Sequence, residues 1–276
     1  MRLSFNKIFY NRRSNVLSRD LFGMNFPNTL GYVFDTGLYQ DKYNSPSLIK
    51  YGFVEVGPYT LKPQESSQKR MFIKRLTGVN VNRGVRALIE DIKDDKPEMP
   101  LCVNISHNDS SIEEESIIRD YTTMYSLVYD FADMILVDSS VKNSDNSKPL
   151  QDISFLCDVL DKLLEIRVYY EIYKPLIIRV AHNISTDRLS ELVNYCLMSN
   201  VDAISVGSGR KALSTVNEIN RLSNNRIPVI VCDNSLSKNN VGEWVSAGAS
   251  LIMTNASFKH RSTRYATKVL RRMEQF

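Results

Sequence analysis

Residues 226–258 read RIPVIVCDNSLSKNNVGEWVSAGASLIMTNASF, and this stretch decides the fold. The apolar run 227–232 is too short for an ordinary helix, so it predicts a buried parallel strand. A second such run, 249–253, follows after about one helix length. The segment between them has an apolar stripe that predicts a helix, with Ser235 or Ser237 as its cap and Gly248 at its end. The stretch therefore predicts a strand–helix–strand unit.

The loop after the first of these strands carries Asp233, Asn234 and Ser235. In a (β/α)8 barrel the loops after the last two strands often bind phosphate, and glycines there let backbone N–H groups approach the anion. A carboxylate at this position repels a phosphate, and side chains fill the space that glycines leave open. The loop thus keeps the position of a phosphate site without its usual chemistry.

The rest of the chain continues the same alternation. Six further apolar segments predict strands, at 30–34, 53–57, 101–105, 134–137, 175–180 and 203–206, with helical patterns between them and a last helix at 265–273. Eight strands alternating with eight helices predict one α/β domain, a (β/α)8 TIM barrel over residues 21–276. A doubly wound open sheet is the alternative, because strand order cannot be deduced from one sequence. Ser111 followed by Glu114 predicts a capping box for the helix at 111–129.

Charge is concentrated at the two ends of the 276-residue chain. The net charge is +4, but residues 1–20 carry five Lys or Arg against one Asp, and residues 259–276 carry six against one Glu. We expect a basic N-terminal arm at residues 1–20, too short for a two-helix domain. Basic ends favour at most a weak contact with an anionic membrane, and nucleic acid is not the expected partner. The chain lacks both a long apolar run and a signal-peptide pattern, so we expect it in the cytoplasm, with the inner face of the membrane as an alternative.

Three segments resemble the FMN-dependent dihydroorotate dehydrogenases, in particular their membrane-associated, quinone-using class. They are LFGMNFPNTLG at 21–31, GFVEVGPYTLKPQ at 52–64 and AGASL at 247–251. Weaker matches occur in the same order between them, so the resemblance covers about residues 21–258. It implies an FMN-binding (β/α)8 barrel that oxidises dihydroorotate to orotate.

The resemblance also assigns positions to a cofactor site. Asn104 matches an asparagine that contacts the flavin, and Arg179 matches a lysine that stabilises reduced flavin. Arginine keeps the charge of that lysine but is planar and bulkier. Asp233 and Asn234 match the glycine pair that binds the phosphate of FMN.

The matched substrate positions have changed more. Ser140 matches the serine that acts as the base, whereas Val137 and Lys142 stand at two substrate-binding amides, and Arg75 at a third. Ser208 lies in GSGR at 207–210, which replaces a longer glycine-rich loop. A substrate-binding lysine falls on residues 35–38, where no cation stands, although Lys42 is near enough to leave that register open.

Other polar residues have simpler explanations. His107 and His182 follow barrel strands, but without neighbouring carboxylates they do not predict a metal site. Residues 207–210 either form a tight turn or bind a phosphate at a helix start. Ser140 needs an arranged proton acceptor to act as a base.

Residues expected to bind cofactor or substrate are replaced at matched positions all around the site, which argues against an unchanged reaction. We expect a dihydroorotate-dehydrogenase-like barrel with degraded FMN and orotate sites, which is either a pseudoenzyme or repurposed for another ligand or partner. No bound cofactor is expected on this hypothesis. The alternative is a divergent FMN-dependent dihydroorotate dehydrogenase of pyrimidine biosynthesis that passes electrons to a quinone. A third hypothesis is that the basic ends have an unrelated binding role and that the barrel is only their scaffold.

Overall fold

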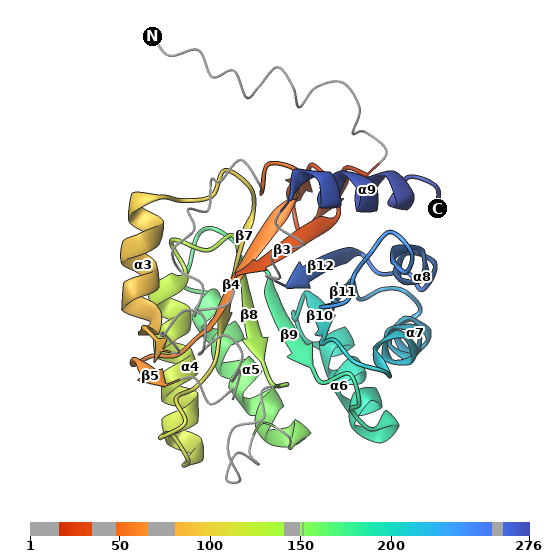
Figure 1. The fold of residues 1–276 in the computed structure, drawn as a ribbon. Coiled ribbons are helices and arrows are strands. Elements are labelled where there is room, and N and C mark those ends of the chain that lie inside the picture. The colour runs from red at the N-terminus through yellow and green to blue at the C-terminus, as the bar shows by residue number, and fades with distance from the viewer. Residues whose placement is uncertain (1–16, 35–47, 66–80, 141–149, 151, 256–261) are drawn as a thin grey trace.

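Eight parallel strands close into a barrel in the computed structural model (Figure 1). The structure describes residues 17–34, 48–65, 81–140, 150, 152–255 and 262–276. Around the barrel the strands are β3 (Leu30–Phe34), β4 (Phe53–Tyr59), β7 (Leu101–Ile105), β8 (Met134–Asp138), β9 (Leu176–Val180), β10 (Ala203–Val206), β11 (Val229–Cys232) and β12 (Leu251–Asn255). Since β12 pairs with β3, the TIM barrel is confirmed and the open sheet is excluded.

Helices cover the outside of the barrel. In the described residues they are α3 (Gly84–Asp94), α4 (Glu114–Val128), α5 (Ile153–Arg167), α6 (Thr186–Met198), α7 (Ala212–Ser223), α8 (Val241–Ser246) and α9 (Thr263–Met273). The small strands β5 (Gln64–Glu65) and β6 (Val81–Asn82) pair outside the barrel. Most of the β3–β4 connection, residues 35–47, lies outside the described residues.

The capping box predicted at Ser111 is wrong. Helix α4 begins with Glu113 as its N-cap, which makes no side-chain cap bond. The Ser111 hydroxyl instead donates to the buried Asp120 carboxylate at 2.6 Å, which is a stronger, charge-assisted bond. Similarly, α8 starts only after Asn240 and not at the predicted Ser235 or Ser237, while Gly248, with φ of +84°, follows its end as expected.

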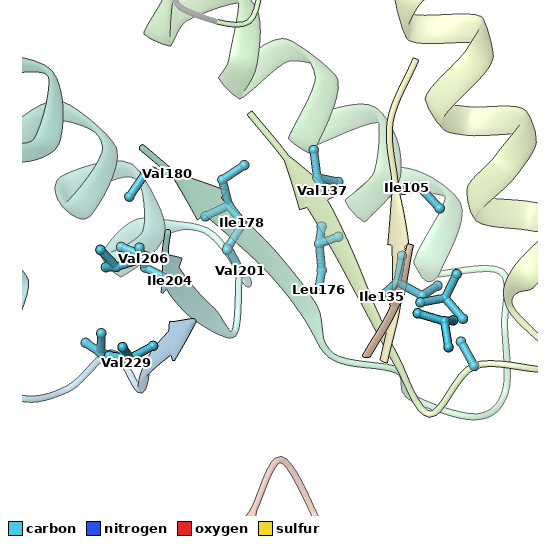
Figure 2. Close-up of a cluster of buried hydrophobic side chains, with 14 of the residues drawn as sticks. Ile105, Ile135, Val137, Leu176, Ile178, Val180, Val201, Ile204, Val206 and Val229 are labelled. Carbon is cyan, nitrogen blue, oxygen red and sulfur yellow. The ribbon is translucent and has the colours of Figure 1, made fainter. Parts of the chain in front are cut away.

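Each barrel strand separates two hydrophobic cores, because successive side chains point to opposite faces. One set of side chains packs outward against the helices, as Figure 2 shows for Ile105, Val137 and Ile178. The other set fills the barrel interior and includes Phe53, Met134 and Leu251. This alternation decides which residues can reach the interior.

A short hairpin covers the amino-terminal end of the barrel. Strands β1 (Arg19–Leu21) and β2 (Met24–Phe26) pair antiparallel, and Phe26 is fully buried with its ring edge-on to Phe53, 5.7 Å between centroids. Leu21, Phe22 and Met24 pack against the same interior cluster. The hairpin begins at Arg19, so the boundary of the predicted arm at residue 20 falls inside it; residues 1–16 lie outside the described residues.

Among the described residues, no helix is long and apolar enough to span a membrane.

Candidate functional site

The carboxyl ends of the barrel strands carry a buried layer of polar side chains. Arg179 on β9 lies at its centre, with 6% of its surface exposed. Its Nη1 and Nη2 donate to the two carboxylate oxygens of Glu55 on β4, at 2.8 and 2.5 Å. Its Nε donates to the Ser205 hydroxyl at 3.2 Å, and Asp138 on β8 lies 3.5 Å from Nη1. This arrangement holds the guanidinium inside the barrel.

The charges of this layer decide the state of Arg179. Burial acts to lower its pKa, but the carboxylates of Glu55 and Asp138 outweigh burial and hold the pKa well above its ordinary value. The guanidinium is therefore a permanent cation paired with Glu55. A fork-to-fork pair of this kind fixes the plane of the guanidinium as well as its position.

Asn104 on β7 belongs to the same layer and is fully buried. Its amide nitrogen donates to Glu55 at 3.0 Å and to Asp138 at 3.4 Å. Its Oδ1 has no hydrogen-bond partner within the part of the chain that the structure describes. An unpaired buried acceptor is uncommon in proteins. A hydrogen bond donated to it by a ligand or a water molecule is therefore especially favourable.

Ser140 has the proton acceptor that the sequence did not reveal. Its hydroxyl donates to Asp138 Oδ1 at 2.5 Å, and its backbone N–H donates to the same oxygen at 2.9 Å. Asp138 Oδ2 faces Arg179 and Asn104. The Asp138 carboxylate thus connects Ser140, at the rim, to the buried ion pair.

Val137, matched in sequence to a substrate-binding amide, points away from the interior. It is fully buried in the outer core, next to the helices (Figure 2). The inward position at the end of β8 belongs to Asp138. Val137 therefore packs in the outer core, and Asp138 is the side chain of this strand end that faces Arg179 and Asn104.

The β11–α8 loop is organised around the buried Asp233 carboxylate. Oδ1 accepts the backbone N–H and the hydroxyl of Ser235, at 2.8 and 2.7 Å. Oδ2 accepts the indole N–H of Trp244 on α8 at 2.9 Å and the amide of Asn240 at 3.3 Å. Only 4% of Asp233 is exposed. An anion is therefore already present in this loop, and four donors of the chain itself surround it.

The remaining matched positions lie nearby or outside the described residues. Ser208 follows β10, and its hydroxyl accepts the backbone N–H of Asn234 at 3.3 Å, which links the two neighbouring loops. His182 lies close to Gly209, because a Cβ on that glycine would come within 2.0 Å of the imidazole ring. Arg75, Lys142 and the segment 35–42 lie outside the described residues.

His107 is buried beside Tyr121 and Asp120. Burial lowers its pKa, and Asp120 opposes that shift. Its Nδ1 lies 3.4 Å from the Tyr121 hydroxyl, a contact inside the outer core. Among the described residues, no group of three or more His, Cys, Asp or Glu side chains could hold a metal ion.

No protein-family model matches the chain. Curated relatives do. The protein named dihydroorotate dehydrogenase (quinone) from Christiangramia forsetii is 26% identical over 88% of this chain and 80% of the relative. The protein of the same name from Wigglesworthia glossinidia brevipalpis is 28% identical, over 83% of this chain and 79% of the relative. Over most of its length the chain is thus similar to proteins named dihydroorotate dehydrogenase (quinone).

Solved structures agree on the fold. Ligand-free DHODH from Eimeria tenella superposes with a TM-score of 0.75 at 17% identity, covering 96% of this chain and 88% of the other. The same enzyme in complex with ferulenol gives 0.74. These solved structures confirm the fold, and the curated relatives bear out the expected resemblance to dihydroorotate dehydrogenases.

Sequence reasoning missed several residues of this site, Glu55 and Trp244 among them. Glu55 had a signal, since an acidic residue within the apolar run FVEV of a buried strand requires a buried cation as its partner. Trp244 had a weaker one, because the indole of a buried tryptophan generally finds an acceptor. Neither partner could be named from one sequence.

Proposed function

We propose that this dihydroorotate-dehydrogenase-like barrel has lost FMN binding and dihydroorotate oxidation and serves as a pseudoenzyme or binds another ligand or partner. The observation that carries the proposal is the Asp233 carboxylate. It accepts the Ser235 N–H and the Trp244 N–H, so donors at the matched phosphate position are already used.

The residues of this loop do not fit the phosphate of FMN. A like charge about 5 Å away, at an effective dielectric constant of about 20, costs about 3 kcal/mol per ligand charge, or about a hundredfold in affinity. The four bonds to Asp233 also make its displacement unfavourable, because a buried carboxylate must keep its partners.

Arg179 supports the same proposal from the other side of the site. Its pairing with Glu55 and Ser205 engages the guanidinium nitrogens inside the barrel. If a reduced flavin were to be stabilised by Arg179, the guanidinium would have to leave its pair with Glu55.

Flavin content tests the proposal. The protein purified without added cofactor should carry no stoichiometric FMN, and titration with FMN should show weak binding. The double variant Asp233→Gly, Asn234→Gly should bind FMN about a hundredfold more tightly. Asn239→Gly, an exposed change in the same loop, is the matched control. One equivalent of flavin per purified chain contradicts the proposal.

One observation favours the alternative, a divergent dihydroorotate dehydrogenase that reduces a quinone. Asn104 keeps its place in the barrel with Oδ1 unpaired in the described residues, and Ser140 has a carboxylate acceptor in Asp138. Dihydroorotate-dependent reduction of a quinone by the FMN-loaded protein, abolished in Ser140→Ala, would establish this activity.

A weak contact with anionic surfaces also stays a proposal. Helix α9 exposes Arg264, Lys268, Arg271 and Arg272 while it buries Ala266, Val269 and Met273. Binding to vesicles containing anionic lipid should weaken steeply as salt rises, because exposed charges are screened. Equal binding to neutral vesicles contradicts it.

A further inference from the structure

A cavity of about 310 Å³ lies at the end of the barrel opposite the candidate site, where hairpin β1–β2 meets α8, β12 and the C-terminal residues after α9. Its volume is at the lower end of the range for small-molecule sites. We infer that this cavity binds a free amino acid with a large apolar side chain. The lining residues are Leu17, Ser18, Arg19, Thr29, Val245, Ala249, Ile252, Met273, Glu274 and Phe276.

The cavity floor suits an apolar side chain. Ile252 and Met273 are 1% and 3% exposed and belong to the outer core, and the half-buried Val245 and Ala249 lie beside them. Leu17 contributes to the wall from the hairpin side. Burial of a ligand side chain here removes apolar surface from water on both partners.

One wall depends on the ring of Phe276, although 59% of that residue is exposed. The ring lies under the Arg272 guanidinium, 4.8 Å from its centroid. It also crosses α8 at Gly242, where a Cβ would come within 2.2 Å of the ring. The missing side chain at Gly242 therefore gives the Phe276 ring room to lie against α8.

Two side chains of opposite charge border the cavity from different elements. Arg19 comes from β1 and Glu274 from the residue after α9. They form no ion pair with each other, and among the described residues the one hydrogen bond of the Arg19 side chain is a long one, 3.3 Å from Nη1 to the Ser250 carbonyl.

An amino acid matches this arrangement because it carries a carboxylate and an ammonium on one carbon. The carboxylate would accept from the Arg19 guanidinium, which binds carboxylates in a two-pronged geometry, and the ammonium would donate to Glu274. The apolar side chain would then enter the cavity. The inference is independent of the fate of the FMN site at the other end of the barrel.

Trp244, the single tryptophan of the chain, adjoins the cavity residue Val245 and serves as a fluorescent reporter. The full-length protein is titrated with L-phenylalanine, L-leucine and L-methionine, followed by calorimetry and by Trp244 fluorescence. Phenethylamine lacks the carboxylate and 3-phenylpropionate lacks the ammonium. We expect saturable binding of L-phenylalanine, at least tenfold weaker binding of either analogue, and no measurable binding of glycine.

Variants assign that binding to the cavity. Arg19→Gln and Glu274→Gln should each weaken L-phenylalanine binding at least tenfold, and Ala249→Trp should abolish it by filling the cavity. Lys268→Gln on the exposed side of α9 is the matched control and should bind normally. Circular dichroism checks that each variant is folded. The inference is overturned if none of the amino acids binds at millimolar concentration, if the analogues bind as well as phenylalanine, or if both charge variants bind normally.

Discussion

Arg179 is a buried cation with two carboxylates beside it, and the balance among the three side chains decides what a substitution does. Arg179→Met leaves both Glu55 and Asp138 without their cation, whereas Glu55→Gln leaves Arg179 facing Asp138 at 3.5 Å. Removing one partner of a buried pair costs about 3–5 kcal/mol because the other charge stays in a medium of low polarity.

We therefore predict an asymmetry. Arg179→Met should lower the free energy of unfolding by about 3–5 kcal/mol, and Glu55→Gln by less. The double variant should cost less than the sum of the two, because the unpaired Glu55 carboxylate is gone. Urea unfolding followed by circular dichroism measures all three, and strictly additive losses would show that the two side chains act independently.

The bond from Trp244 to Asp233 gives a second prediction at this scale. Trp244→Phe removes a 2.9 Å donor to a buried carboxylate and should cost about 1.5–3 kcal/mol, the range for hydrogen bonds to charged groups. Ser235→Ala also removes a donor to this carboxylate, but Ser235 is exposed and water can replace its hydroxyl, so about 0.5–1.5 kcal/mol is expected. Thermal unfolding compares the two, and an equal loss would contradict the leading role of the indole.

Individual site residues were only partly predictable from the sequence. The inward direction of Asn104 and Arg179 follows from the resemblance and holds in the structure. The outward direction of Val137 could not be deduced from the sequence, because a shift of one residue along a strand moves a side chain to the other face of the sheet. In the structure Asp138, and not Val137, faces Arg179 and Asn104.

At the scale of elements, the hairpin β1–β2 is the least standard part of the barrel. Phe26 closes the amino-terminal end by packing against Phe53. Phe26→Ala should cost about 3–5 kcal/mol, as truncations of fully buried aromatic residues do. Asn25→Ala, an exposed change one residue away, should stay within about 0.5 kcal/mol. Chemical denaturation measures both, and a small loss for Phe26→Ala would show that the hairpin is dispensable for barrel stability.

Strands were easier to predict than helix ends. A strand that is buried on both faces has a short, nearly continuous apolar sequence, and all eight barrel strands show this pattern. Helix starts depend on one hydrogen bond at the cap, and other partners can take that side chain. Ser111 illustrates this, because Asp120 takes its hydroxyl.

At the scale of the molecule, the two cores determine thiol reactivity. All four cysteines are free, and burial, only partly offset by Arg179, raises the pKa of Cys232 to about 12. Burial also raises the pKa of the half-buried Cys157 to about 11. At pH 8 the thiolate fraction of a group with pKa 12 is about one in ten thousand, and the thiolate is the reactive form.

The native protein should thus react slowly with iodoacetamide at pH 8, with Cys157 first because it is the most accessible. Reactivity should rise as pH increases toward these raised pKa values. In denaturant all four thiols should react at ordinary rates, which peptide mass spectrometry can follow. Rapid native labelling of Cys232 would show that the barrel interior opens to solvent.

The pairing of β12 with β3 has a consequence for synthesis. Leu30 lies opposite Ile252, so these partners are 222 residues apart in the chain (252 − 30). A nascent polypeptide cannot close the sheet until β12 has left the ribosome, and until then the edge of β3 that pairs with β12 lacks its partner. Long-range pairing of this kind slows folding and exposes edges to aggregation. Slower translation at low temperature, or more abundant chaperones, should therefore raise the soluble yield.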